Sequence, residues 1–143
     1  MREIKFRGKA KMSIEELNKL GLKHENGWVV GNLVMYGKTP YIVGDFIEVD
    51  AEYTVNEFWV EVIPDTVGQF SGLKDMNGRD IYEGDIVECF VNGNSYVSFK
   101  GGVYGLIYDY SFIPFSDIHG EMKVIGNIYE NKHLLEEVNN ESK

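Results

Sequence analysis

The chain has 143 residues, which suits one domain or two small subdomains that share a core. Its net charge of -9 argues against long-range attraction to nucleic acid, and its 43% apolar content is enough for a packed interior. The single cysteine, Cys89, excludes an intrachain disulfide, and no apolar run reaches the roughly 20 residues that span a bilayer. Together with an N-terminus that lacks the apolar core of a signal peptide, these facts predict a protein of the reducing cytoplasm.

The charge is unevenly distributed. Residues 1–12 hold one acidic residue, Glu3, and carry a charge of about +4. Their five cations, in order, are Arg2, Lys5, Arg7, Lys9 and Lys11. The rest of the chain is strongly acidic. This basic N-terminal segment either binds nucleic acid or pairs with the protein's own acidic body or a neighbouring subunit. The overall charge favours pairing within the protein or with a subunit.

The first half of the chain predicts one strand, one short helix and further strands. Alternation over residues 2–9 predicts a strand with Ile4 and Phe6 facing inward. The Ser-x-x-Glu capping pattern that begins at Ser13 predicts a helix over about residues 13–20. Its apolar stripe is Ile14, Leu17 and Leu20, and Gly21 ends it. An Asn-Gly turn at residues 26–27 precedes strands expected at 28–36, 41–43, 46–55 and 57–63.

The second half predicts short strands joined by glycine-rich turns. Pro64 marks the expected boundary between an N-terminal subdomain (residues 1–64) and a C-terminal one (residues 65–138), followed by a disordered tail (139–143). Strands are expected at residues 85–91, 96–99, 103–108 and 123–129, an irregular segment at 111–115 and one or two helical turns at 131–138. The predicted fold class is α+β, predominantly β, with N-terminal strands and a short helix packed on a small SH3-like β-barrel.

Two glycine motifs in this half have structural interpretations. The segment from Asp75 to Asp80 lacks the glycine and glutamate positions of a calcium-binding loop, so its Asn77-Gly78 pair predicts a hairpin turn. The Glu83-Gly84-Asp85 motif places a glycine directly before a buried alternating strand, which favours a turn over a catalytic role.

An acidic row forms the second candidate interaction site. Glu48, Asp50 and Glu52 alternate with apolar residues, so on a single strand they would share one face at a spacing of roughly 6–7 Å. Such a row is usually a solvated face that protects a sheet edge. Two alternatives stay open: the row binds a divalent cation, or it imitates a phosphate backbone.

The sequence shows no catalytic, cofactor or metal site. His24, His119 and His133 are far apart and make no zinc pattern with Cys89. No nucleophile with a partner base and no nucleotide-binding motif is visible, so we expect a protein that is not an enzyme and needs no cofactor. A metal-dependent enzyme that acts on nucleic acid is the weaker alternative, and it would need Asp45, Glu48 and Asp50 to gather around one ion.

Several segments resemble the YopX family of small proteins encoded by bacteriophages and prophages. The matching segments are residues 4–9 (IKFRGK), 28–29, 31–33, 67–75 (VGQFSGLKD), 77–78, 81–87 (IYEGDIV) and 124–131 (VIGNIYEN). They follow in order over nearly the whole chain. The helix at residues 13–20 departs from this pattern as an insertion. The resemblance implies a β-rich, oligomeric phage accessory protein without an established activity, so no catalytic residue is carried over.

The expected function is therefore an interaction module. Charge favours a protein partner, of the host or the phage, over nucleic acid bound at the basic N-terminal segment. A DNA-mimicking acidic surface would be one form of protein-binding module. A homo-oligomer is also expected, because five aromatic residues are too many for one small barrel to bury. They are Tyr104, Tyr108, Tyr110, Phe112 and Phe115.

Overall fold

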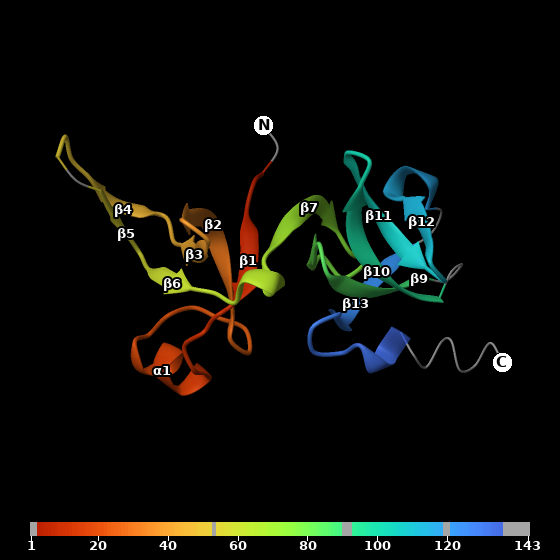
Figure 1. Ribbon diagram of the computed structural model, residues 1–143, viewed down its shortest axis with the longest axis horizontal. Helices are drawn as coiled ribbons and strands as arrows, with labels where there is room; N and C mark the ends of the chain where they lie inside the picture. The colour runs from red at the N-terminus through yellow and green to blue at the C-terminus, as the bar shows by residue number, and fades with distance from the viewer. Residues whose placement is uncertain (1–2, 53, 90–92, 119–120, 136–143) are drawn as a thin grey trace. The chain divides into compact units, whose positions relative to one another are not determined.

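The computed structural model describes residues 3–52, 54–89, 93–118 and 121–135 (Figure 1). The chain folds as two compact units, Met1–Gln69 and Phe70–Lys143. The division follows Gln69, a few residues beyond the expected boundary at Pro64. Both units are built from antiparallel strands with little helix, so the prediction of a predominantly β fold is confirmed.

Unit 1 is an antiparallel sheet in which β1, β2 and β3 lie side by side in sequence order, while β6 and the start of β7 pair at its two sides. Its strand order is β6-β3-β2-β1, and the first two residues of β7 pair with β1 on its other side. The strands are β1 (Phe6–Lys9), β2 (Trp28–Tyr36), β3 (Thr39–Val43), β6 (Trp59–Glu61) and β7 (Gly68–Lys74), and a short 3-10 turn, η1 (Pro64–Thr66), precedes β7. The predicted Asn-Gly turn is confirmed: Asn26 has φ 52° and Gly27 φ 88°, a left-handed pair that suits a two-residue hairpin loop.

The helix α1 (Ile14–Lys19) begins as its sequence predicts. The Ser13 hydroxyl accepts a hydrogen bond from the Glu16 backbone N–H at 3.1 Å and donates one to the Glu16 carboxylate at 3.2 Å. Only Leu17 of the predicted stripe is buried, at 0% exposure. Ile14 and Leu20 are exposed, because a helix of six residues turns a single apolar position toward the sheet.

The core of unit 1 lies between α1 and the sheet. Its buried residues are Ala10, Leu17, Val29, Ile42, Val60 and Val62, with Phe6 packed at their edge. The inward position of Phe6 is confirmed and that of Ile4 is wrong, since Ile4 is 55% exposed. Ile4 precedes the first residue that pairs with β2, so the alternation of the sequence extends beyond the strand itself.

Residues 46–55 form a hairpin rather than the single predicted strand. Strand β4 (Phe46–Val49) pairs with β5 (Thr54–Asn56) as a separate two-stranded sheet. Backbone bonds from Gly44 to Phe58 and from Glu57 to Asp45 join it to β3 and β6, so it is the outer half of one long hairpin. We call residues 45–57 the arm; Figure 1 shows it extending away from the other strands of unit 1.

Unit 2 holds a five-stranded antiparallel sheet of order β12-β11-β10-β9-β13. These strands are β9 (Asp85–Cys89), β10 (Gly93–Lys100), β11 (Val103–Tyr108), β12 (Ser111–Pro114) and β13 (Met122–Asn127), with η2 (Phe115–Asp117) after β12. The end of β7 and β8 (Asp80–Tyr82) form a hairpin beside it. Within the described residues the order is open, so closure into an SH3-like barrel stays a prediction.

Other details of unit 2 correct one sequence prediction and confirm others. The segment expected to be irregular contains β12, because Pro114 occupies the end of an edge strand, where its missing N–H costs nothing. The predicted hairpin across Lys100 is confirmed, with Gly101 and Gly102 at positive φ. The predicted helical turns at 131–138 are helical at 133–135; residues 136–138 and the predicted disordered tail lie outside the described residues.

Four of the five aromatic residues that suggested an oligomer are half-buried within unit 2. Tyr104 and Phe115 pack against the core of Ile81, Val87, Val97, Leu106 and Val124. Phe112 lies against Gly105, where an added Cβ would come 2.6 Å from its ring. Only Tyr110 is strongly exposed, at 95%. The oligomer prediction assumed that a small barrel could not bury these five rings. Unit 2 half-buries four of them, so only Tyr110 fits that assumption.

Candidate protein-interaction surface

The basic row of the first strand makes contacts within unit 1. Lys5 forms an ion pair with Glu3 at 2.6 Å. Lys11 forms one with Glu61, also at 2.6 Å. The Lys9 ammonium donates a hydrogen bond to the Asn26 carbonyl oxygen at 2.6 Å.

Arg7 is the buried member of this row, at 8% exposure. Its guanidinium lies 5.0 Å from the centre of the Trp28 ring, and the Lys9 ammonium lies 5.8 Å from the same ring. A phosphate that paired with the row would compete with these contacts. Arg2, the fifth predicted cation, lies outside the described residues.

The predicted acidic row is not a row on one strand. Asp50 and Glu52 lie in the turn between β4 and β5, where the Glu52 backbone N–H donates to the Asp50 carboxylate at 3.2 Å. Glu48 is on β4, and its side chain lies outside the described residues. The prediction of a common strand face is wrong because the chain reverses direction at this point.

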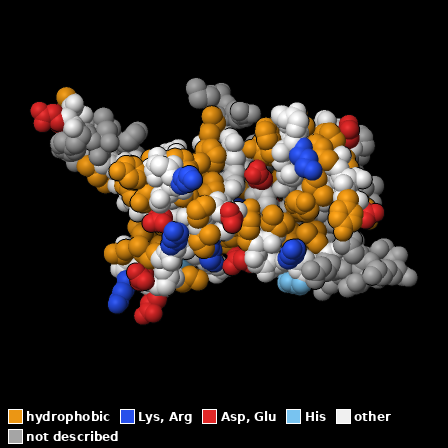
Figure 2. Space-filling model, viewed as in Figure 1, with side chains coloured by type: hydrophobic (Ala, Val, Ile, Leu, Met, Phe, Trp, Pro, Cys, Tyr) orange, Lys and Arg blue, Asp and Glu red, His pale blue; other side chains and the backbone are white. Residues whose placement is uncertain are grey.

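The arm is nevertheless the acidic part of unit 1. Residues 39–73 contain no lysine or arginine, and their acidic residues are Asp45, Glu48, Asp50, Glu52, Glu57, Glu61 and Asp65. Acidic side chains gather at the outer end of the arm (Figure 2). Apolar side chains accompany them: Ile47, the extra residue of a β-bulge, is 64% exposed, and Val55 is 36% exposed.

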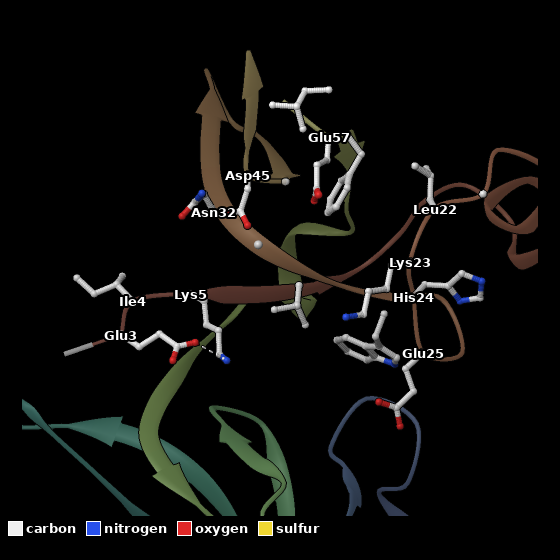
Figure 3. Close-up of a pocket in the computed structure, with 17 residues that line it drawn as sticks. Glu3, Ile4, Lys5, Leu22, Lys23, His24, Glu25, Asn32, Asp45 and Glu57 are labelled. Atoms are coloured by element: carbon white, nitrogen blue, oxygen red, sulfur yellow. Dashed lines mark ion pairs between the residues drawn. The ribbon is translucent and has the colours of Figure 1, made fainter. Parts of the chain in front are cut away.

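A cleft of about 1010 Å³ lies at the base of the arm (Figure 3). Asp45, Ile47 and Glu57 line it from the arm, and Val30 and Asn32 line it from β2. The start of the chain contributes Glu3, Ile4 and Lys5, and the segment between α1 and β2 contributes Leu22, Lys23, His24 and Glu25. The cleft therefore combines exposed aliphatic side chains with carboxylates and two lysines.

The Asp75 carboxylate fixes the turn between β7 and β8. It is buried, and its Oδ1 accepts from the backbone N–H groups of Asn77 and Arg79 at 2.9 Å each. Its Oδ2 accepts from the Val124 backbone N–H on β13, also at 2.9 Å. Burial alone raises the pKa of Asp75, but these three hydrogen bonds and the nearby Arg79 charge together hold it below its usual range. The turn interpretation of this motif is confirmed.

The Glu83-Gly84-Asp85 motif is also a structural turn. Asp85 is 1% exposed and accepts a hydrogen bond from the Tyr82 backbone N–H at 2.8 Å. Gly84 has φ 92° and lies against the Tyr129 ring, where an added Cβ would come within 2.9 Å. Burial raises the pKa of Glu83 above its usual range. The motif thus fixes the turn that precedes β9.

The described residues hold no group of three or more acidic, histidine or cysteine side chains that could bind a metal ion. His24 is engaged, since one ring nitrogen lies 2.7 Å from the Asn18 side-chain oxygen and the other accepts from the Gly27 backbone N–H. His133 is exposed and Cys89 is 1% exposed, while His119 lies outside the described residues. No helix in the described part is long and apolar enough to cross a membrane.

Sequence reasoning missed the cleft and the place of Asp45 and Glu57 beside it. These two residues are twelve positions apart, and their backbones meet only because the arm folds back. One signal pointed to the region: the long stretch without a lysine or arginine.

Comparison with known proteins identifies the family and the fold. The YopX protein family model matches residues 5–136. A crystal structure of protein EF1440 from Enterococcus faecalis is similar, with a TM-score of 0.52 and 21% identity over 94% of this chain and 99% of that chain. A comparison with curated proteins gives no match. The match spans nearly all the segments on which the sequence resemblance rests, and the chain belongs to the YopX family.

Proposed function

We propose that this chain is a phage or prophage accessory protein that acts as a non-enzymatic protein-interaction module, and that the arm binds a basic surface of a protein partner. The observation that carries the proposal is the arm itself. It is an exposed hairpin with acidic residues, no lysine or arginine, and apolar side chains such as Ile47 held in solvent.

The chemistry of the arm supports a protein partner over a small ligand. Exposed apolar side chains gain free energy when a partner removes them from water. Acidic residues around them favour a positively charged partner and repel negatively charged ones. A basic protein surface with an apolar centre satisfies both requirements.

Nucleic acid bound at the basic strand is the competing function. Lys5 and Lys11 are ion-paired, and Arg7 is buried against Trp28. A phosphate backbone would therefore gain little from this strand, since each contact with it would replace one that already exists.

The test compares two doubly substituted full-length chains of equal charge. One carries Asp50→Lys with Glu52→Lys at the end of the arm. The matched control carries Asp65→Lys with Glu121→Lys, also at exposed positions. A partner captured from bacterial lysate by the unsubstituted chain is identified and purified, and its Kd for each chain is measured over a range of salt concentrations.

Weakening by about tenfold or more with the arm variant alone, and weaker binding at higher salt, is the expected result. Equal Kd values for the two variants would contradict the proposal. Tight binding of duplex or single-stranded DNA with a steep salt dependence, lost on Lys5→Glu with Arg7→Glu, would replace it with the nucleic-acid function.

A further inference from the structure

We infer that the cleft at the base of the arm binds an extended, basic peptide segment of the partner, which adds as a short strand to the edge of β2 at Val30. This inference rests on the proposed function and names how the partner is held. Its evidence is the pairing pattern of β2, the aliphatic side chains of the cleft, and the carboxylates at the base of the arm.

The pairing register leaves part of one edge of β2 without a neighbouring strand. Strand β1 pairs with Trp28 to Gly31 on one edge. On the other edge β3 pairs with β2 only from Asn32 onward, and Trp28 exchanges two backbone hydrogen bonds with Glu25, so the gap lies at Val30. Within the described residues, no strand covers that second edge at Val30. Exposed strand edges of this kind are where peptides add to sheets.

The direction of the Val30 backbone groups follows from the alternation of antiparallel pairing. Opposite Val30 is Arg7, whose pairing with Gly68 directs its own backbone groups toward β7. The Lys9 backbone N–H likewise points away from β2, to the Thr66 hydroxyl at 2.9 Å. Since backbone groups alternate between the two edges, those of Val30 face the second edge, on the side of the cleft.

Aliphatic side chains line the cleft at positions that suit an extended segment. Ile4, Val30 and Ile47 come from three separate parts of unit 1 and are 55%, 44% and 64% exposed. An extended peptide presents alternate side chains to one face. Its apolar residues would cover these three side chains and remove them from water.

The carboxylates determine the charge of the occupant. Asp45 and Glu57 face each other across the arm's base, where the Glu57 N–H donates to the Asp45 carbonyl oxygen at 2.9 Å, and both line the cleft. Lys5, one of the two lysines in the lining, is paired with Glu3. Lysine or arginine side chains of the peptide, alternating with its apolar ones, would find their counter-charges at Asp45 and Glu57.

The size of the cleft also favours a peptide. Its volume of about 1010 Å³ lies at the upper end of the range for small-ligand sites. Its polar groups are spread along the lining instead of converging on one point (Figure 3). A compact metabolite would leave most of them without a contact.

The test uses the full-length ¹⁵N-labelled chain and an octapeptide in which lysine alternates with valine. We expect NMR shift changes that saturate at the Val30 amide and at Asn32. The same peptide with N-methyl groups on alternate residues, which removes backbone donors, should bind about tenfold more weakly, the loss of a backbone hydrogen bond or two. Absence of a Val30 shift at millimolar peptide overturns the inference.

Two substituted chains separate this inference from the proposed function. Asp45→Lys with Glu57→Lys should raise the Kd of the peptide about tenfold. Asp65→Lys with Glu121→Lys should leave this Kd unchanged. Shifts confined to the arm's end, lost only on Asp50→Lys with Glu52→Lys, would overturn the cleft inference and leave the proposed function standing. Val30 shifts that depend on the concentration of the chain alone would assign the cleft to a second copy, which also overturns it.

Discussion

At the scale of single residues, Asp75 and Asp85 show what the most family-like motifs of this chain do in the fold. Both carboxylates are buried, and both accept hydrogen bonds from backbone N–H groups of their own turns. A carboxylate used in this way stabilises a turn that a neutral side chain fixes less well. Replacing either carboxylate should therefore lower the free energy of unfolding.

Asp75→Asn should lower the free energy of unfolding at pH 7 by about 2 kcal/mol. An asparagine oxygen can still accept from Asn77 and Arg79, but its NH₂ group then meets the Val124 N–H, two donors face to face. Urea unfolding measures the change. Asp65→Asn, at an exposed carboxylate, is the control and should change stability by less than about 0.5 kcal/mol.

The contribution of Asp75 should also depend on pH. Its pKa in the folded chain is lowered from an ordinary value of 3.8, so its stabilisation is complete above that value and is lost as pH falls through the folded pKa. The difference between the wild type and Asp75→Asn should therefore shrink below about pH 4. Urea titrations at a series of acidic pH values test this, and a difference that grows in acid would contradict it.

Tyr110 is held in a strained conformation without compensating burial. It follows Asp109 in the two-residue loop between β11 and β12, with φ 66°, and it is 95% exposed. Asparagine tolerates this left-handed region better than tyrosine does, so Tyr110→Asn should raise the unfolding free energy by about 0.5–1 kcal/mol. Tyr36→Asn, at an exposed strand position, should give no increase; equal effects of the two substitutions would refute the strain argument.

At the scale of elements, the arm differs from every other hairpin of unit 1. Strands β4 and β5 form a two-stranded sheet of their own, and the core residues that the structure describes in this unit come from outside the arm. A two-stranded hairpin on its own is marginal in water. The arm is thus a feature that folding of unit 1 does not require.

Replacement of residues 46–56 by Asn-Gly should leave unit 1 folded. The backbone bond between Glu57 and Asp45 already closes the base of the hairpin, and a two-residue loop suits that geometry. The midpoint of thermal unfolding should change by only a few degrees, as for a change of less than about 1 kcal/mol. Loss of the cooperative transition would show instead that the arm is part of the folding unit.

At the scale of the whole molecule, the association state stays a prediction. Most of the aromatic residues that suggested an oligomer are half-buried, but Phe99, Val103 and Tyr110 of unit 2 remain at least 47% exposed. Exposed apolar groups of this size are common at interfaces. Light scattering at micromolar concentration should therefore give a mass above the 16.3 kDa of a single chain, and a single-chain mass across that range would refute the expectation.

The sequence by itself determined the features that depend on residues close together in the chain. The Ser13 cap, the Asn26-Gly27 turn and the extent of β2 follow from contacts within a few positions, where side-chain chemistry and φ preferences decide. The two aspartate motifs were interpreted correctly for the same reason. Family membership followed too, because the matching segments keep their order along the chain.

Only the tertiary structure decided what the charged residues do. Alternation over residues 46–55 is compatible with one strand or with two that fold back, and the choice depends on β3 and β6, which continue into the arm. Lys11 finds its counter-charge at Glu61, fifty positions away, a pairing that no local pattern contains. The cleft arises because β1 and β3 cover different halves of β2. Such offsets are set by the packing of distant strands, so the candidate site could not be read from the sequence.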